Sequence, residues 1–242
     1  MERISSYFRP KSIGEALSML DQPGAVLVGG GTKLRARSGR GSISVIDLQQ
    51  AGLGGIDRVD TETLQIGATT TLQQLVENEH VPSAVREAAR RELPSTLRAQ
   101  SSLGGTIANG DWESELLAVL LVHDAVVFLA GPKGTERIGL GAVLAQLPLD
   151  QGCIVTAVAI DTHGEALVAR TARTVADKPI VAAAARRGAD GRRRVAVSGV
   201  ASTPVVVEDP GEIDPPGDFR GSSVYRRALA GVLISRVIEG TK

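Results

Sequence analysis

Cysteines and closely spaced histidines, the residues that hold iron–sulfur clusters and many metal ions, are nearly missing from this sequence. Cys153 is the only cysteine, so neither an intrachain disulfide nor a cysteine-ligated cluster can form within this chain. The histidines, His80, His123 and His163, lack the close spacing of metal-binding pairs. We therefore expect no metal site in this polypeptide.

Aromatic residues and an excess of charge of either sign are also lacking. Three Phe, two Tyr and one Trp leave the core to Val, Leu, Ile and Ala. Lys plus Arg and Asp plus Glu number 27 each, so no net field attracts nucleic acid or an acidic membrane surface. The most basic stretch, residues 186–194, contains Asp190-Gly191, which predicts a hairpin whose arginines decorate the strand ends.

A long hydrophobic run is absent as well. The most apolar stretch, Leu116 to Ala130, is interrupted by His123 and Asp124 and is too short to cross a bilayer. The opening Met1-Glu2-Arg3 leads into polar residues rather than the apolar core of a secretion signal. We expect a cytoplasmic protein without a membrane span.

Helix and strand patterns indicate an α+β fold. A first lobe, residues 1–55, has a capping pattern at Ser12 that opens a helix, followed by strands at 25–28 and 44–48. A second lobe, residues 56–148, has a further capping pattern at its Thr71. Its other predicted elements are strands at 64–67 and 125–129 and helices at 82–91 and 113–121.

The turn-rich residues 148–152 form the predicted boundary to a C-terminal α+β domain, residues 152–242. Apolar segments separated by turn signals suit a mostly antiparallel sheet, and a helix from about 223 to 238 ends the chain. The predicted strands are 153–160, 165–171, 179–186, 194–200 and 204–207.

Two glycine-rich segments are the strongest functional signal. They are Gly29-Gly30-Gly31-Thr32 and the run 101–111, SSLGGTIANGD, which contains Gly104 and Gly105. Glycines let a backbone lie against a ligand, and successive N–H groups in such turns form a concavity that binds phosphate oxygens. The second run adds short hydrogen-bonding side chains at Ser102, Thr106 and Asn109. Two separate glycine loops indicate a long ligand held at two points, such as a dinucleotide.

The common nucleotide motifs do not account for the first segment. A P-loop requires Ser or Thr after its lysine, but Leu34 follows Lys33. The dinucleotide pattern Gly-x-Gly-x-x-Gly fails because position 34 is leucine. Taken alone, this segment is more often a plain turn than a ligand-binding loop.

The two segments together resemble the FAD-binding subunit of the molybdenum hydroxylases, the xanthine dehydrogenase and carbon monoxide dehydrogenase family. Residues 29–34, GGGTKL, correspond to a family loop of the type Ala-Gly-Gly-Thr-Asp-Leu. Residues 102–112, SLGGTIANGDW, correspond to Thr-Ile-Gly-Gly-Asn-Ile-Ala-Asn-Ala-Asp-Pro. Shorter familial fragments are found at Tyr7–Pro10, Ile46–Leu48, Ile66–Ala68, Leu97–Arg98 and Val224–Arg227.

The resemblance implies a two-lobed FAD-binding domain of the PCMH type, followed by a C-terminal domain like that of carbon monoxide dehydrogenase flavoproteins. It implies FAD as this chain's cofactor, with no catalytic side chain of its own, because the cofactor carries the chemistry. The residues expected at FAD are Gly29, Gly30, Gly31, Thr32, Lys33, Ser102, Gly104, Gly105, Thr106, Asn109, Asp111, Glu115 and Arg170.

Arg170 occupies the position of a family lysine close to the isoalloxazine, in a pattern that Arg173 and Asp177 complete. A cation there would stabilise the negative charge of the reduced flavin. An ordinary surface ion pair between Arg173 and Asp177 is an equally good interpretation. Arg98 is interpreted as a structural clamp on neighbouring carbonyl groups.

Four positions depart from the family pattern: Lys33 replaces Asp, Thr106 replaces Asn, Trp112 replaces Pro and Glu115 replaces Asp. Lys33 is either attracted to the pyrophosphate or a solvated surface lysine. We expect Trp112 to be a buried packing residue rather than a flavin-stacking one.

By resemblance, the chain passes electrons from the two [2Fe–2S] clusters of a small subunit through FAD to NAD⁺ or another acceptor. A large subunit carries the molybdenum cofactor, in a dimer of heterotrimers. The four departures motivate a rival reading, a flavin-free structural subunit that keeps the fold and the partner interface. A self-standing flavin reductase of related fold is a third possibility.

Overall fold

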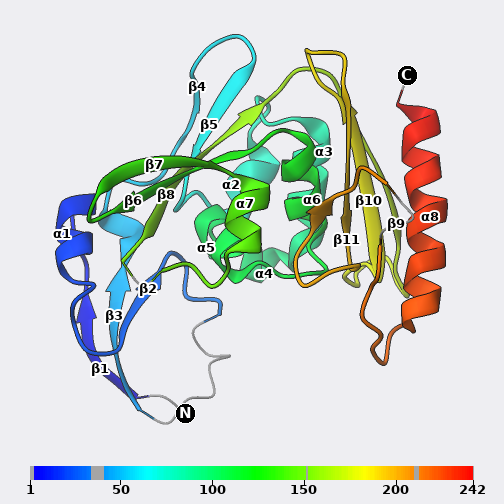
Figure 1. Ribbon diagram of the computed structural model, residues 1–242. Coiled ribbons are helices and arrows are strands. Elements are labelled where there is room, and N and C mark those ends of the chain that lie inside the picture. The colour runs from blue at the N-terminus through cyan, green and yellow to red at the C-terminus, as the bar shows by residue number, and fades with distance from the viewer. Residues whose placement is uncertain (1–2, 34–40, 151, 210–212, 242) are drawn as a thin grey trace.

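The computed structural model describes residues 3–33, 41–150, 152–209 and 213–241. Three sheets follow one another across the molecule, with helices packed between and outside them (Figure 1). Among the described residues, no helix is both long enough and apolar enough to cross a membrane.

The first lobe is a three-stranded parallel sheet of order β1-β3-β2. Helix α1 begins after Ser12, whose Oγ accepts a hydrogen bond from the Glu15 N–H at 3.2 Å, and so confirms the predicted cap. The sequence patterns correctly located β2 and most of β3 but missed β1. The elements of this lobe are β1 (Arg3–Phe8), α1 (Ile13–Ser18), β2 (Ala25–Val28), β3 (Ser42–Asp47) and η2 (Leu48–Gln50).

The second lobe is a five-stranded antiparallel sheet of order β4-β5-β8-β6-β7, with helices packed on it. The predicted capping box at Thr71 is confirmed, since Thr71 and Gln74 exchange side-chain-to-backbone hydrogen bonds. Its strands are β4 (Ile56–Arg58), β5 (Thr63–Gly67), β6 (Val126–Gly131), β7 (Gly134–Gly139) and β8 (Ile154–Asp161). Its helices are α2 (Leu72–Glu77), α3 (Ser83–Glu92), α4 (Ser95–Arg98), α5 (Leu103–Asn109), α6 (Glu115–Val122) and α7 (Leu140–Ala145).

Strand β8 corrects one assignment made from the sequence. Residues 153–160 were expected in the C-terminal sheet, but β8 pairs with β5 and β6 in the centre of the second-lobe sheet. A buried apolar strand fits either sheet by its pattern alone, so only long-range pairing decides. The three domain ranges stay a prediction.

The C-terminal part is a four-stranded antiparallel sheet of order β12-β11-β10-β9. Alternate side chains of β10 face opposite sides: Ala184 joins the core around α6, whereas Ala183 and Ala185 join the core beneath α8. Figure 1 shows α8 along the outer face of this sheet. The elements are β9 (Ala166–Thr171), β10 (Val181–Arg187), β11 (Arg193–Ser198), β12 (Val205–Val206) and α8 (Ser223–Gly240).

The basic stretch lies on the β10–β11 hairpin, as predicted, with Gly191 at a φ of 73° in its turn. The expectation that its arginines decorate strand ends is wrong for Arg186, which is 0% exposed. Its guanidinium donates to the carbonyl oxygens of Val122 and His163 and to the carboxylates of Asp124 and Asp161. Arg186 thus ties the C-terminal sheet to the second lobe.

Candidate functional site

The first glycine segment is a loop that leaves β2 and runs against the second segment. Gly31 has a φ of 73°, a conformation that favours glycine. A Cβ on Gly30 would lie 1.6 Å from the carbonyl oxygen of Gln100, so only glycine permits this approach. The Ser101 Oγ donates to the Thr32 Oγ1 at 2.9 Å and links the two segments directly.

The second segment is a helix start rather than a loop. Residues Leu103–Asn109 form α5, with Ser102 as its N-cap, and the Gly105 N–H donates to the Ser102 Oγ at 3.2 Å. The Gly104 N–H donates to the carbonyl oxygen of Ala68 at 2.8 Å, and a Cβ there would lie 2.8 Å from the Ala68 Cβ. The predicted turn of phosphate-binding N–H groups is therefore wrong for these glycines, because Gly104 serves packing and Gly105 serves the cap.

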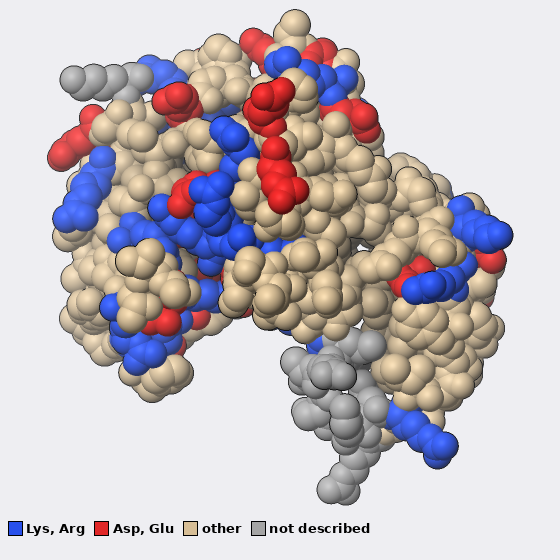
Figure 2. Space-filling view, turned by 180° about the vertical axis from the view of Figure 1, so that it is seen from behind, with Lys and Arg blue, Asp and Glu red and all other residues tan. Residues whose placement is uncertain are grey.

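A cavity of about 540 Å³ lies between the two segments, within the usual size of a ligand site. The residues expected at FAD all line it, except Gly104, Glu115 and Arg170. Glu92, Leu93, Ser101 and Lys178 also line it and were not anticipated. Seen from behind, the surface mixes charges of both signs, and its outline is indented beside the N-terminal lobe (Figure 2).

The loop after β2 presents the free backbone donors that an anionic group requires. Within the part of the chain that the structure describes, the N–H groups of Gly30, Gly31 and Thr32 donate to no protein acceptor. All three residues line the cavity. Unpaired, adjacent N–H groups suit phosphate oxygens, so this loop fits the pyrophosphate of a dinucleotide.

Glu115 and Arg170 pair with each other away from the cavity lining. Arg170 Nε lies 3.0 Å from Glu115 Oε2, and Arg91 Nη1 lies 3.1 Å from Glu115 Oε1. Burial raises the pKa of Glu115, although the two arginines oppose this shift. Arg170 also donates to the carbonyl oxygen of Asp177 at 2.5 Å. Arg170 therefore contacts protein groups and does not line the cavity.

Lys178 is the cation that reaches the cavity from the C-terminal part. Its Nζ lies 2.7 Å from Asp111 Oδ2 and 3.1 Å from Glu92 Oε1. These partners are 67 and 86 residues away in the sequence, and no local motif marks Lys178. A tertiary contact of this range leaves no periodic signal, so the sequence could not reveal it.

Three other expectations have clear outcomes. Arg98 is a structural clamp, as predicted, and donates to the carbonyl oxygens of Arg90 and Leu93 at 2.6 and 3.1 Å. Trp112 is a packing residue: its partly buried ring lies 4.4 Å from the Arg226 guanidinium, and it does not line the cavity. Arg173 and Asp177 form an exposed pair 3.9 Å apart.

Comparison with known proteins identifies the class of this fold and site. Residues 2–161 match the family described as the FAD binding domain in molybdopterin dehydrogenase. The chain belongs to this family, an oxidoreductase family, and the resemblance stated from the sequence is confirmed.

Particular relatives extend over nearly the whole chain. The uncharacterized protein YgfM of Escherichia coli K12 is 33% identical over 252 residues, which cover 96% of this chain and 94% of YgfM. The carbon monoxide dehydrogenase medium chain of Afipia carboxidovorans is 27% identical over 280 residues, which cover 98% of this chain and 96% of that one. A chain of the carbon monoxide dehydrogenase structure from Hydrogenophaga pseudoflava superposes with a TM-score of 0.85 at 24% identity, over 98% of this chain and 96% of that one. This likeness confirms the α+β fold.

Proposed function

We propose that this chain binds one FAD in the cavity and is the electron-transfer subunit of a molybdenum hydroxylase. In this proposal a large subunit carries the molybdenum cofactor and oxidises the substrate, and a small subunit carries two [2Fe–2S] clusters. The chain takes electrons from those clusters and delivers them to NAD⁺ or another acceptor, within a dimer of heterotrimers. FAD supplies the ability to store two electrons that arrive singly.

The observation that carries this proposal is the meeting of two distant segments around unpaired N–H groups. The loop Gly29–Lys33 offers its amides to a pyrophosphate, and Ser101 fixes the loop through Thr32. On the facing wall, Asn109 offers both an amide donor and a carbonyl acceptor to the cavity. The family to which the chain belongs is defined by FAD binding.

The departures from the family pattern leave the cavity open. Thr106 donates from Oγ1 to the carbonyl oxygen of Ser102 at 3.0 Å, and Lys33 is exposed at the rim. Trp112 and Glu115 lie outside the lining. None of these residues blocks the site, so these contacts favour the flavin-binding reading over the flavin-free structural subunit.

The direct test is FAD binding by the purified chain and by two glycine variants. We expect one FAD per chain by absorbance after acid extraction, and loss of FAD in Gly30→Val, because a side chain there collides with Gln100. Gly14→Ala is the matched control, since its Cβ meets no atom within 4 Å. A colourless wild-type chain that acquires no FAD on titration would leave the structural-subunit reading.

The electron-transfer role needs the assembled complex. Coexpression with an iron–sulfur subunit and a molybdenum subunit, followed by anaerobic substrate addition, should bleach the flavin bands after the clusters are reduced. Reduced clusters beside a permanently oxidised flavin would contradict the role. Rapid NADH oxidation by the isolated chain would instead support a self-standing reductase.

A further inference from the structure

Lys178 lies on the connection between β9 and β10 and brings a cation from the C-terminal sheet to the cavity wall. The two carboxylates that hold it are themselves held. Glu92 Oε2 accepts from the Ser114 Oγ at 2.9 Å, and Asp111 Oδ1 accepts from the Glu113 N–H at 3.1 Å. The two carboxylates are therefore held in place by their own hydrogen bonds, and they fix the position of the Lys178 ammonium group.

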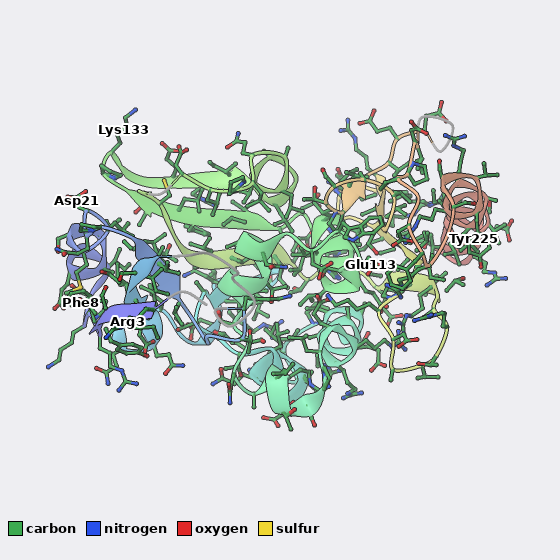
Figure 3. The ribbon with its side chains drawn as sticks, turned by 90° about the horizontal axis from the view of Figure 1, so that it is seen from below. Arg3, Phe8, Asp21, Glu113, Lys133 and Tyr225 are labelled. Carbon is green, nitrogen blue, oxygen red and sulfur yellow. The ribbon has the colours of Figure 1, made fainter. Side chains whose placement is uncertain are left out.

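The main chain of Lys178 is held as well. Arg220 donates to the Lys178 carbonyl oxygen and also pairs with Glu113, beside the residues that position Asp111. Figure 3 shows Glu113 on the side of the molecule that carries α8 and Tyr225, and Glu113 Oε1 lies 3.6 Å from Nη2 of Arg226 on that helix. Both ends of the Lys178 side chain are thus anchored.

One donor of Lys178 remains available. An ammonium group has three N–H donors, and Asp111 and Glu92 take two of them. The side chain is 26% exposed and lines the cavity. Burial lowers the pKa of Lys178, but the two carboxylates more than offset this and leave the pKa raised. The group therefore carries its charge at neutral pH.

The local charge indicates which part of a dinucleotide this wall suits. Two carboxylates hold the Lys178 ammonium group, and the charge of Lys33 also acts on Asp111, so the charged groups at this wall balance and add no net attraction for phosphates. A lysine donor beside an aspartate acceptor complements a ring edge where C=O and N–H groups alternate. The isoalloxazine has such an edge, whereas adenine has no carbonyl group.

We propose that Lys178 is a cofactor-binding residue whose free N–H donates to the isoalloxazine, while Asp111 and Glu92 hold it in place. This inference rests on FAD binding in the cavity. It assigns to Lys178 the contact with the flavin ring that the sequence pattern suggested for Arg170. Arg170 itself contacts Glu115 and main-chain carbonyl groups. The C-terminal part of the chain thereby influences the reduction potential of the flavin.

The test compares Lys178→Gln and Lys178→Arg with Lys133→Gln, a substitution in the turn between β6 and β7, away from the cavity. Loss of a charge-assisted hydrogen bond should weaken FAD binding at least about tenfold in Lys178→Gln. It should also lower the reduction potential of the bound flavin, because the cation favours the more negative reduced form. Lys178→Arg, which keeps the charge, should retain a potential near that of the wild type, and Lys133→Gln should change neither quantity.

Each outcome of this test has one meaning. Weaker binding with an unchanged potential overturns the ring contact, since a merely structural role moves affinity alone. Wild-type affinity and potential in Lys178→Gln overturn the Lys178 assignment and leave the proposed function intact. Failure of the wild-type chain to bind FAD overturns both. Circular dichroism of each variant before FAD addition verifies that the chain is folded.

Discussion

Two of the polar junctions between the C-terminal part and the second lobe differ in how their cations are held. At the cavity junction, Lys178 contacts two carboxylates, keeps a spare donor and stays partly exposed. At the closed junction, Arg186 is fully buried and donates to two carboxylates and to main-chain carbonyl groups. At the closed junction, the protein supplies the acceptors for the Arg186 guanidinium. At the cavity junction, one N–H donor of Lys178 remains for a ligand.

This difference determines whether a cation contributes mainly to the stability of the fold or mainly to ligand binding. A buried cation with full pairing contributes to the folded state mainly through the penalty of leaving its partners unpaired. A partly exposed cation beside a cavity contributes less to folding and more to recognition. We therefore expect substitutions at the closed junction to act on unfolding, and substitutions at the cavity to act on FAD.

The largest expected effect is at the closed junction. Arg186→Met should lower the free energy of unfolding by about 3–5 kcal/mol, because Asp161 loses its arginine and the carbonyl oxygens of Val122 and His163 lose their donor, whereas Asp124 keeps Arg194. Arg187→Met, at the neighbouring exposed position, is the control and should change little. Chemical denaturation measures both. If Arg186→Met lowered the free energy of unfolding no more than Arg187→Met does, the closed junction would not differ from the cavity junction in its contribution to stability.

Sequence patterns predicted the fold well where they were local. The caps at Ser12 and Thr71, strand β2 and the β10–β11 hairpin were all found, because caps, apolar runs and an Asp-Gly turn act within a few residues. Strand β8 belongs to another sheet than the one expected, since a buried and mostly apolar strand does not reveal its neighbours.

The site was predicted in part for the same reason. The glycine segments stood out because close approach to Gln100 and Ala68 requires glycine, although helix α5 was mistaken for a loop. Lys178 and Glu92 were missed because their contact joins distant segments. Arg170 was placed at the cofactor by family pattern, and the structure instead pairs it with Glu115.

A second, somewhat smaller effect comes from His123 beside the closed junction. Its Nδ1 lies 2.7 Å from the carbonyl oxygen of Asp161 and therefore carries the proton, while Nε2 is buried without a partner. Burial lowers the pKa of His123 to about 4, and nearby Arg186 acts in the same direction. The folded state thus favours the neutral ring.

The sign follows from this lowered pKa. The contribution is fully present above the unfolded pKa of 6.5 and is lost as the pH falls toward 4, because the unfolded chain binds the proton more readily. We expect a loss of about 3 kcal/mol between these limits. Unfolding measured from pH 7 to pH 4 should show a flatter dependence in His123→Gln than in the wild type. Identical slopes would show that His123 is not the titrating group.

The smallest expected effect concerns two neighbouring glycines in the first turn of α5, of which one packs against the protein and the other lines the cavity. Gly104 faces Ala68 in the protein, whereas Gly105 lines the cavity, and its added Cβ would meet only the Ser102 hydroxyl at 3.0 Å. Gly104→Ala should therefore lower the free energy of unfolding by about 1–2 kcal/mol, since overpacking exceeds the gain in helix propensity. Gly105→Ala should leave unfolding nearly unchanged and weaken FAD binding, because the new methyl group enters the ligand space. Thermal unfolding without FAD and FAD titration of both variants separate the two effects. If both variants lost stability equally and bound FAD equally, these adjacent glycines would serve packing alone, and α5 would not belong to the cofactor site.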